Sequence, residues 1–109
     1  MTRETVAVVV VTYNRAELLG RMLDGLAAQT HRPDAVYVLD NASTDDTRAV
    51  LEARTDLPLL VTHGEENLGG SWGFHLGVRQ AYDAGHSRIW LMDDDVVPAP
   101  DCLEVLLRH

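Results

Sequence analysis

The 109-residue sequence contains one cysteine, no lysine and no apolar run longer than the six residues Val6 to Val11. A single cysteine excludes an internal disulfide and agrees with a reducing compartment. An apolar run of six residues is far short of the ~20 residues that span a bilayer. It is also a poor signal-peptide core, because Thr12-Tyr13-Asn14-Arg15 follows where small residues would be expected. We therefore expect a soluble, cytoplasmic domain without a membrane span.

Positive charge is scarce as well, since nine basic residues stand against seventeen acidic ones and the formal net charge is -8. Binding to a polyanion is driven by Lys and Arg at phosphates, so we expect no nucleic-acid partner. A small phosphate ligand is still compatible with this charge if a cation, a helix N-terminus or backbone N–H groups offset the repulsion. The five histidines show no spacing typical of a structural zinc site.

The composition is that of an ordinary globular protein, with 46% hydrophobic and 24% charged residues. There are no internal repeats, low-complexity tracts or linkers. We therefore expect a single domain over residues 1–109, which is short for an enzyme that must hold two substrates.

Strand patterns alternate with helix patterns along the chain. Apolar, β-branched runs predict strands at 6–11, 35–39, 57–62 and 88–92. Amphipathic spacing predicts helices at 15–26 and 44–54, a third that the segment 67–73 opens and that runs to about 84, and a last one after Pro100. Pro58 places the third strand at a sheet edge or occupies its first position. This alternation with short connections predicts an α/β fold with a doubly wound, mostly parallel sheet and helices on both faces.

Some local features of the helices can also be predicted. Asn14 is expected to cap the first helix, Ser43 or Thr44 the second, and Gly85 to close the third. The inner face of the third helix is expected to carry Phe74, Val78, Ala81 and Tyr82.

The unusual motifs all follow predicted strands. They are Thr12-Tyr13-Asn14, Asp40-Asn41, Asn67 to Gly73 and Asp93 to Asp95. In doubly wound sheets ligands bind outside the carboxyl ends of the strands, where the strand order reverses. We therefore expect these motifs to form one site.

The acidic triplet Asp93-Asp94-Asp95 directly follows an apolar strand, where like charges repel strongly and require neutralisation. Alternate residues of an extended segment share a face, so Asp93 and Asp95 can point at one ion while Asp94 points elsewhere. Hard cations such as Mn²⁺ or Mg²⁺ prefer carboxylate oxygens together with substrate phosphates. A solvated acidic turn is the alternative, and the position after a buried strand favours the metal.

The other motifs each have two interpretations. The segment Asn67 to Gly73 exposes backbone at a helix start, where a phosphate or sugar could approach. However, it matches neither the glycine motif of dinucleotide-binding proteins nor the phosphate-binding loop of nucleotide-hydrolysing enzymes, and it could be only a turn. Asp40 could accept a hydrogen bond from a base or a ribose hydroxyl, or merely cap the chain. Tyr13 could stack on a base or cover the end of the sheet.

Taken together, Val10 to Arg15, Asp40 to Asp45, Asn67 to Gly70 and Trp90 to Pro98 resemble family 2 glycosyltransferases of the GT-A fold. The resemblance covers essentially the whole chain. The Gly-Gly-Ser-Trp-Gly-Phe segment and the acidic triplet look closest to bacterial galactofuranosyl- and rhamnosyl-type transferases.

The resemblance implies a role for each motif. Thr12, Tyr13 and Arg15 would line the base pocket, Asp40 would contact the uracil or ribose, and Asn67, Gly69 and Gly70 would lie along the ribose and diphosphate. Asp93 and Asp95 would be the Asp-x-Asp motif that holds Mn²⁺ or Mg²⁺, with Asp93 also reaching the ribose. The implied reaction is inverting transfer of a sugar from a UDP- or dTDP-linked donor to a hydroxyl of an acceptor glycan or lipid-linked sugar.

Members of that family continue into an acceptor-binding half that supplies the general base, whereas this sequence stops at His109. The resemblance therefore implies a donor domain that is part of a longer glycosyltransferase, and the catalytic base is not evident in it. The alternative is a noncatalytic module that binds a nucleotide sugar or a metal, or that serves in assembly. Apolar surface left exposed by a missing half could drive formation of a homodimer. A receiver-type phosphoryl-transfer domain is disfavoured, because the first strand ends without an acidic residue and the chain has no lysine.

Overall fold

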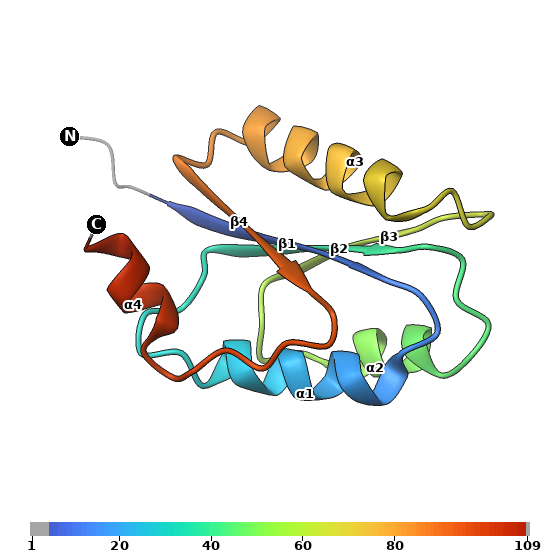
Figure 1. Cartoon of the computed structure of the whole chain (residues 1–109), viewed down its shortest axis with the longest axis horizontal. Helices are drawn as coiled ribbons and strands as arrows, with labels where there is room; N and C mark the ends of the chain where they lie inside the picture. The colour runs from blue at the N-terminus through green and yellow to red at the C-terminus, as the bar shows by residue number, and fades with distance from the viewer. Residues whose placement is uncertain (1–4, 109) are drawn as a thin grey trace.

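A computed structural model describes residues 5–108 (Figure 1). Within this range four strands alternate with four helices, in the order β1 (Val6–Thr12), α1 (Ala16–Ala27), β2 (Ala35–Asp40), α2 (Thr47–Ala53), β3 (Leu59–His63), α3 (Gly70–Asp83), β4 (Arg88–Asp93) and α4 (Cys102–Leu107). The strands form one sheet in which every pairing is parallel. The predicted α/β fold class is therefore confirmed.

The strand order of the sheet is β3-β2-β1-β4. The chain moves outward from β1 to β2 and β3, and then returns to place β4 on the other side of β1, so the order reverses between β1 and β4. The register sets Thr12 beside Asp40 and Val11 beside Asp93, which brings the carboxyl ends of β1, β2 and β4 to the same level. β3 is an edge strand and Pro58 precedes it, as expected.

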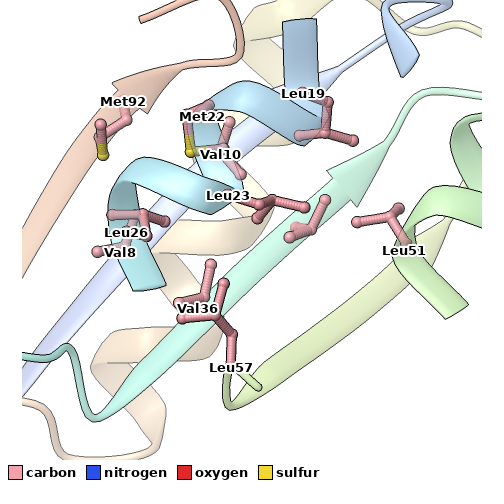
Figure 2. Close-up of a cluster of buried hydrophobic side chains, with 11 residues drawn as sticks. Val8, Val10, Leu19, Met22, Leu23, Leu26, Val36, Leu51, Leu57 and Met92 are labelled. Atoms are coloured by element: carbon pink, nitrogen blue, oxygen red, sulfur yellow. The ribbon is translucent and has the colours of Figure 1, made fainter. Parts of the chain in front are cut away.

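Helices cover both faces of the sheet, with α1 and α2 below it and α3 above it in the view of Figure 1. β1 is buried along nearly its whole length, which explains its continuous apolar sequence. Figure 2 shows the larger core cluster, where the inner face of α1 packs on β1 and β2 and Leu51 of α2 closes one side. The buried residues of α1 are Leu19, Met22, Leu23 and Leu26.

The inner face of α3 consists of small residues. Gly73, Gly77 and Ala81 are its buried positions, and a Cβ atom at Gly73 would lie 2.6 Å from Cγ2 of Val11. The helix therefore packs very close to the sheet. The prediction that Tyr82 belongs to this face is wrong, because its side chain is 75% exposed, and Val78 is only half-buried. The expected end of α3 is confirmed, since Gly85 adopts the left-handed backbone conformation (φ 87°) just after it.

The predicted cap of α1 is also wrong. Asn14 has a left-handed backbone (φ 48°), and the N-cap position belongs to Arg15, whose side chain makes no capping hydrogen bond. Instead, the Asn14 side-chain oxygen accepts hydrogen bonds from the backbone N–H groups of Thr44 and Asp45. Asn14 therefore joins the loop after β1 to the loop after β2.

Likewise, neither Ser43 nor Thr44 caps α2, which begins at Thr47 after the N-cap residue Asp46. The Ser43 hydroxyl accepts the backbone N–H of Asn14. These polar side chains serve the connection between the two loops instead of a helix end, which local spacing could not reveal.

Candidate functional site

A cavity of about 360 Å³ opens at the carboxyl ends of β1, β2 and β4, against the start of α3. Its position is the point where the strand order reverses, where doubly wound sheets bind ligands. The lining residues come from four separate segments of the chain and are Val11, Thr12, Tyr13, Arg15, Asn41, Asn67, Gly69, Gly70, Phe74, Asp93 and Asp94.

The cavity collects most of the residues expected from the sequence. Those that line it are Thr12, Tyr13, Arg15, Asn67, Gly69, Gly70 and Asp93. Asp40 and Asp95 do not line it. Two further hollows, about 350 Å³ between β4 and α4 and about 560 Å³ on the outer face of α3, contain none of the expected site residues.

Asp40 is nearly inaccessible, with 2% of its surface exposed. One carboxylate oxygen accepts the backbone N–H of Ser43 at 3.0 Å, and the other lies 2.8 Å from Nδ1 of His63. The carboxylate thus already has protein partners on both oxygens. Its predicted contact with a base or ribose stays a prediction.

Exposure alternates along the acidic triplet, although β4 ends at Asp93 and the next two residues, Asp94 and Asp95, lie in a turn instead of the expected extended segment. Asp93 and Asp95 are exposed, whereas Asp94 is buried. The Asp94 carboxylate accepts a hydrogen bond from the Thr12 hydroxyl at 2.9 Å and pairs with Nη1 of Arg15 at 3.2 Å. Asp94 therefore ties the end of β4 to the end of β1.

Arg15 is the cation of this acidic corner. Its Nη1 also lies 3.4 Å from a carboxylate oxygen of Asp95, so one guanidinium bridges Asp94 and Asp95. This contact partly neutralises the negative charge of the acidic triplet. The predicted position of Arg15 beside a nucleotide base stays a prediction.

The donor set at this corner suits a hard divalent cation that keeps open positions. Within residues 5–108, no three side chains of His, Cys, Asp or Glu are grouped closely enough to hold a metal on protein ligands alone. Mg²⁺ and similar ions are commonly bound by one or two carboxylates together with substrate phosphates and water. Asp93 and Asp95 are the exposed carboxylates of the triplet, and their role as metal ligands stays a prediction.

The glycine loop before α3 leaves its backbone open. Gly69 has a left-handed backbone (φ 87°), and a Cβ atom at Gly69 or Gly70 would meet no other atom within 4 Å. Within residues 5–108 no side chain caps the first turn of α3, whereas the N–H of the N-cap residue Gly69 donates to Oδ1 of Asn67 at 2.9 Å. The dipole of a 14-residue helix and the N–H groups of its first turn favour an anion at this position.

Sequence reasoning gave no individual site role to four lining residues, namely Val11, Asn41, Phe74 and Asp94, although two of them belong to the motifs expected at the site. Asn41 and Asp94 stand directly beside predicted residues, so their positions at strand ends were a usable signal. Phe74 lies one helical turn after Gly70, a relation that becomes informative only once the helix start is known.

No helix among residues 5–108 is both long and apolar enough to cross a bilayer.

Relatives and solved structures match this chain closely. Galactofuranosyltransferase GlfT1 of Mycolicibacterium smegmatis is 43% identical over 98 residues, which are 88% of this chain and 32% of the relative. An N-acetylglucosaminyl-diphospho-decaprenol L-rhamnosyltransferase of Mycobacterium tuberculosis is 35% identical over 103 residues, which are 90% of this chain and 32% of that protein. The chain thus spans about a third of the length of the curated relatives it matches.

Solved structures agree with the sequence matches. S. aureus TarS in complex with UDP aligns with a TM-score of 0.84 and 28% identity, covering 95% of this chain and 31% of that one. The mannosyltransferase PcManGT of Pyrobaculum calidifontis, in complex with GDP-Man and Mn²⁺, aligns with a TM-score of 0.80 and 32% identity over 94% of this chain and 31% of that one.

The family model of glycosyl transferase family 2 matches residues 7–109. With a parallel sheet like that of the solved transferases, and with motifs gathered where its strand order reverses, this chain belongs to glycosyl transferase family 2.

Proposed function

We propose that the cavity binds a nucleoside-diphosphate sugar, and that the chain is the donor-binding domain of an enzyme that transfers the sugar, with inversion, to an acceptor hydroxyl. The observation that carries this proposal is the convergence of seven expected residues, from the ends of β1 and β4 and from the start of α3, on one cavity. UDP and GDP-Man in two structural neighbours support a nucleoside diphosphate as the ligand class.

Each part of the cavity has a chemical task in this proposal. Tyr13, which is 44% exposed, offers a ring face on which a base can stack. The open backbone at Gly69 and Gly70 would lie along the ribose and diphosphate, and the N-terminus of α3 favours the negative charge of the diphosphate. Thr12 and Asp94 hold the ends of β1 and β4 at a fixed separation.

Asp93 and Asp95 would hold Mn²⁺ or Mg²⁺, and Mn²⁺ in the complex of PcManGT supports this assignment. The metal, when bound, stabilises the negative charge that develops on the departing diphosphate. Arg15, already placed on Asp94 and Asp95, adds a second positive charge on the same side.

Calorimetric titration with UDP, dTDP and GDP, each in Mn²⁺, Mg²⁺ or EDTA, tests the proposal. We expect a saturable heat for at least one nucleotide, and EDTA should weaken binding by about tenfold or more, which corresponds to ~1.4 kcal/mol or more. The absence of binding in all nine conditions would refute the proposal.

Variants separate the metal site from general charge effects. Asp95→Ala should fold normally and show the same nucleotide affinity in Mn²⁺ as in EDTA, because the predicted ligand is gone. Asp83→Ala, which removes an exposed carboxylate at the far end of α3, is the matched control and should keep the full metal dependence. Equal metal dependence in Asp95→Ala and the control would contradict the metal assignment.

A further inference from the structure

Asn41 follows β2 and lines the cavity, although only 2% of its surface is exposed. Its backbone N–H donates to the carbonyl oxygen of Thr12 at 2.9 Å, so the residue is anchored between β1 and β2. A buried amide side chain in such a place must satisfy both its oxygen and its nitrogen.

The orientation of this amide is determined by its neighbour. The Asn41 Oδ1 accepts the backbone N–H of Leu68 at 2.9 Å, and a backbone N–H can only donate. The oxygen must therefore face Leu68, which leaves Nδ2 on the other side. This argument assigns the two amide atoms by chemistry, independently of their similar size and shape.

The Nδ2 group has no hydrogen-bond partner among the described residues. Every side-chain nitrogen or oxygen sealed from solvent within residues 5–108 has a partner, so Nδ2 is not sealed. Nδ2 is therefore an unused donor on a residue that lines the cavity.

The position of Asn41 also indicates which part of a ligand it meets. It stands at the end of β2, and β1 separates it from β4, where Asp93 and Asp95 lie. Two strand spacings amount to roughly 10 Å. A diphosphate near the acidic corner therefore leaves the nucleoside part, and not a phosphate, near Asn41.

We infer that Asn41 determines specificity in the proposed donor site, by presenting an N–H donor that requires an acceptor oxygen on the nucleoside. This inference rests on the proposed function. The acceptor is a carbonyl oxygen of the base. A base with an amino group in place of this oxygen would bring one N–H donor against another, that of Asn41, and would therefore bind more weakly.

UDP and CDP form a suitable pair of probes, because uracil has a carbonyl oxygen where cytosine has an amino group. Affinities for both are measured by calorimetry in Mn²⁺ for the wild type, Asn41→Asp and Ala42→Asp. Asn41→Asp keeps an oxygen for the N–H of Leu68 and replaces the donor by a charged acceptor. Ala42→Asp adds the same charge one residue away, outside the cavity lining, at a left-handed position (φ 63°) that Asp tolerates.

We expect Asn41→Asp to bind UDP roughly tenfold or more weakly than Ala42→Asp does, since a buried donor is lost and an acceptor faces an acceptor. If CDP then binds better than UDP, the partner is the carbonyl oxygen that distinguishes the two bases. If both nucleotides weaken equally relative to the control, Asn41 does not distinguish the two bases, and its role in specificity is contradicted.

Two other results would overturn it, and they differ in what else they refute. If the wild type binds UDP but Asn41→Asp matches Ala42→Asp for both nucleotides, Asn41 has no role in specificity and the proposed function stands. If the wild type binds no nucleoside diphosphate, the proposed function fails as well. Thermal unfolding of each variant confirms that the compared proteins are folded.

Discussion

At the scale of the residue, Asp45 connects the loop after β1 to the loop after β2. Its carboxylate accepts hydrogen bonds from the backbone N–H of Ala16, at the start of α1, and from the backbone and hydroxyl of Thr47, at the start of α2. These bonds, chiefly the one from the Thr47 hydroxyl, lower the pKa of Asp45 from its ordinary value of 3.8.

This lowered pKa predicts a pH dependence of stability. As the pH falls below about 3.8, the unfolded chain takes up a proton at Asp45 before the folded protein does, so the free energy of unfolding decreases toward the folded pKa. Urea unfolding at several pH values should show Asp45→Asn less stable than the wild type at pH 6, with a gap that narrows below about pH 3.8. A gap of constant size would contradict this role.

The neighbouring Asp46 provides the control. Its side chain makes no capping hydrogen bond to α2. Asp46→Asn removes the same charge without breaking the bonds of Asp45, and should therefore cost less stability at pH 6.

Sequence patterns identified most site residues but not their partners. Asn14 was expected to cap the first helix, and this was wrong. Its side-chain oxygen accepts hydrogen bonds from the backbone of Thr44 and Asp45, about thirty residues further along the chain. Similarly, nothing near Asp40 in the sequence indicated that His63 would occupy one of its oxygens. Contacts between distant segments depend on the sheet register, which local spacing does not contain.

At the scale of the element, α3 is held against the sheet by glycine. A Cβ atom at Gly77 would overlap Cγ1 of Val9 and lie 2.7 Å from Cδ2 of Leu39. Both neighbours are fully buried, so neither can move away easily. Because α3 begins at the cavity, its height above the sheet also positions the open backbone of Gly70.

We expect Gly77→Ala to destabilise the protein by about 1–3 kcal/mol through overpacking, although alanine is the better helix former. Gly20→Ala in α1 is the matched control, since its Cβ would have an ordinary contact at 4.0 Å with Val50. That change should stabilise the protein by up to about 1 kcal/mol. Chemical unfolding of both variants checks the two signs, and a neutral or stabilising effect of Gly77→Ala would show that α3 is not tightly packed on the sheet.

The same helix explains an incorrect prediction. Periodicity placed Tyr82 on the inner face because large apolar residues usually mark the buried side of a helix. In α3 the buried side consists of Gly73, Gly77 and Ala81, so the aromatic residue faces outward. Close helix packing through small residues inverts the usual pattern.

At the scale of the whole molecule, the alternation of strands and helices was sufficient to predict the parallel α/β sheet. The strand order β3-β2-β1-β4 could not be read from the sequence, because it depends on which side of β1 receives β4. That choice creates the reversal at which Thr12 and Asp94 meet across 82 residues of chain. The motifs could therefore be recognised singly, whereas their assembly into one cavity required the fold.

The central claim is that a divalent cation and a nucleoside diphosphate share the cavity at the reversal point. Paramagnetic broadening of amide signals by substoichiometric Mn²⁺, with UDP in excess, tests it most directly. The account predicts that signals of Asp93, Asp95 and Gly69 broaden first, that signals at the opposite sheet end near His86 persist, and that EDTA reverses the effect. Broadening centred near His86, or independent of UDP and spread over the molecule, would contradict the account.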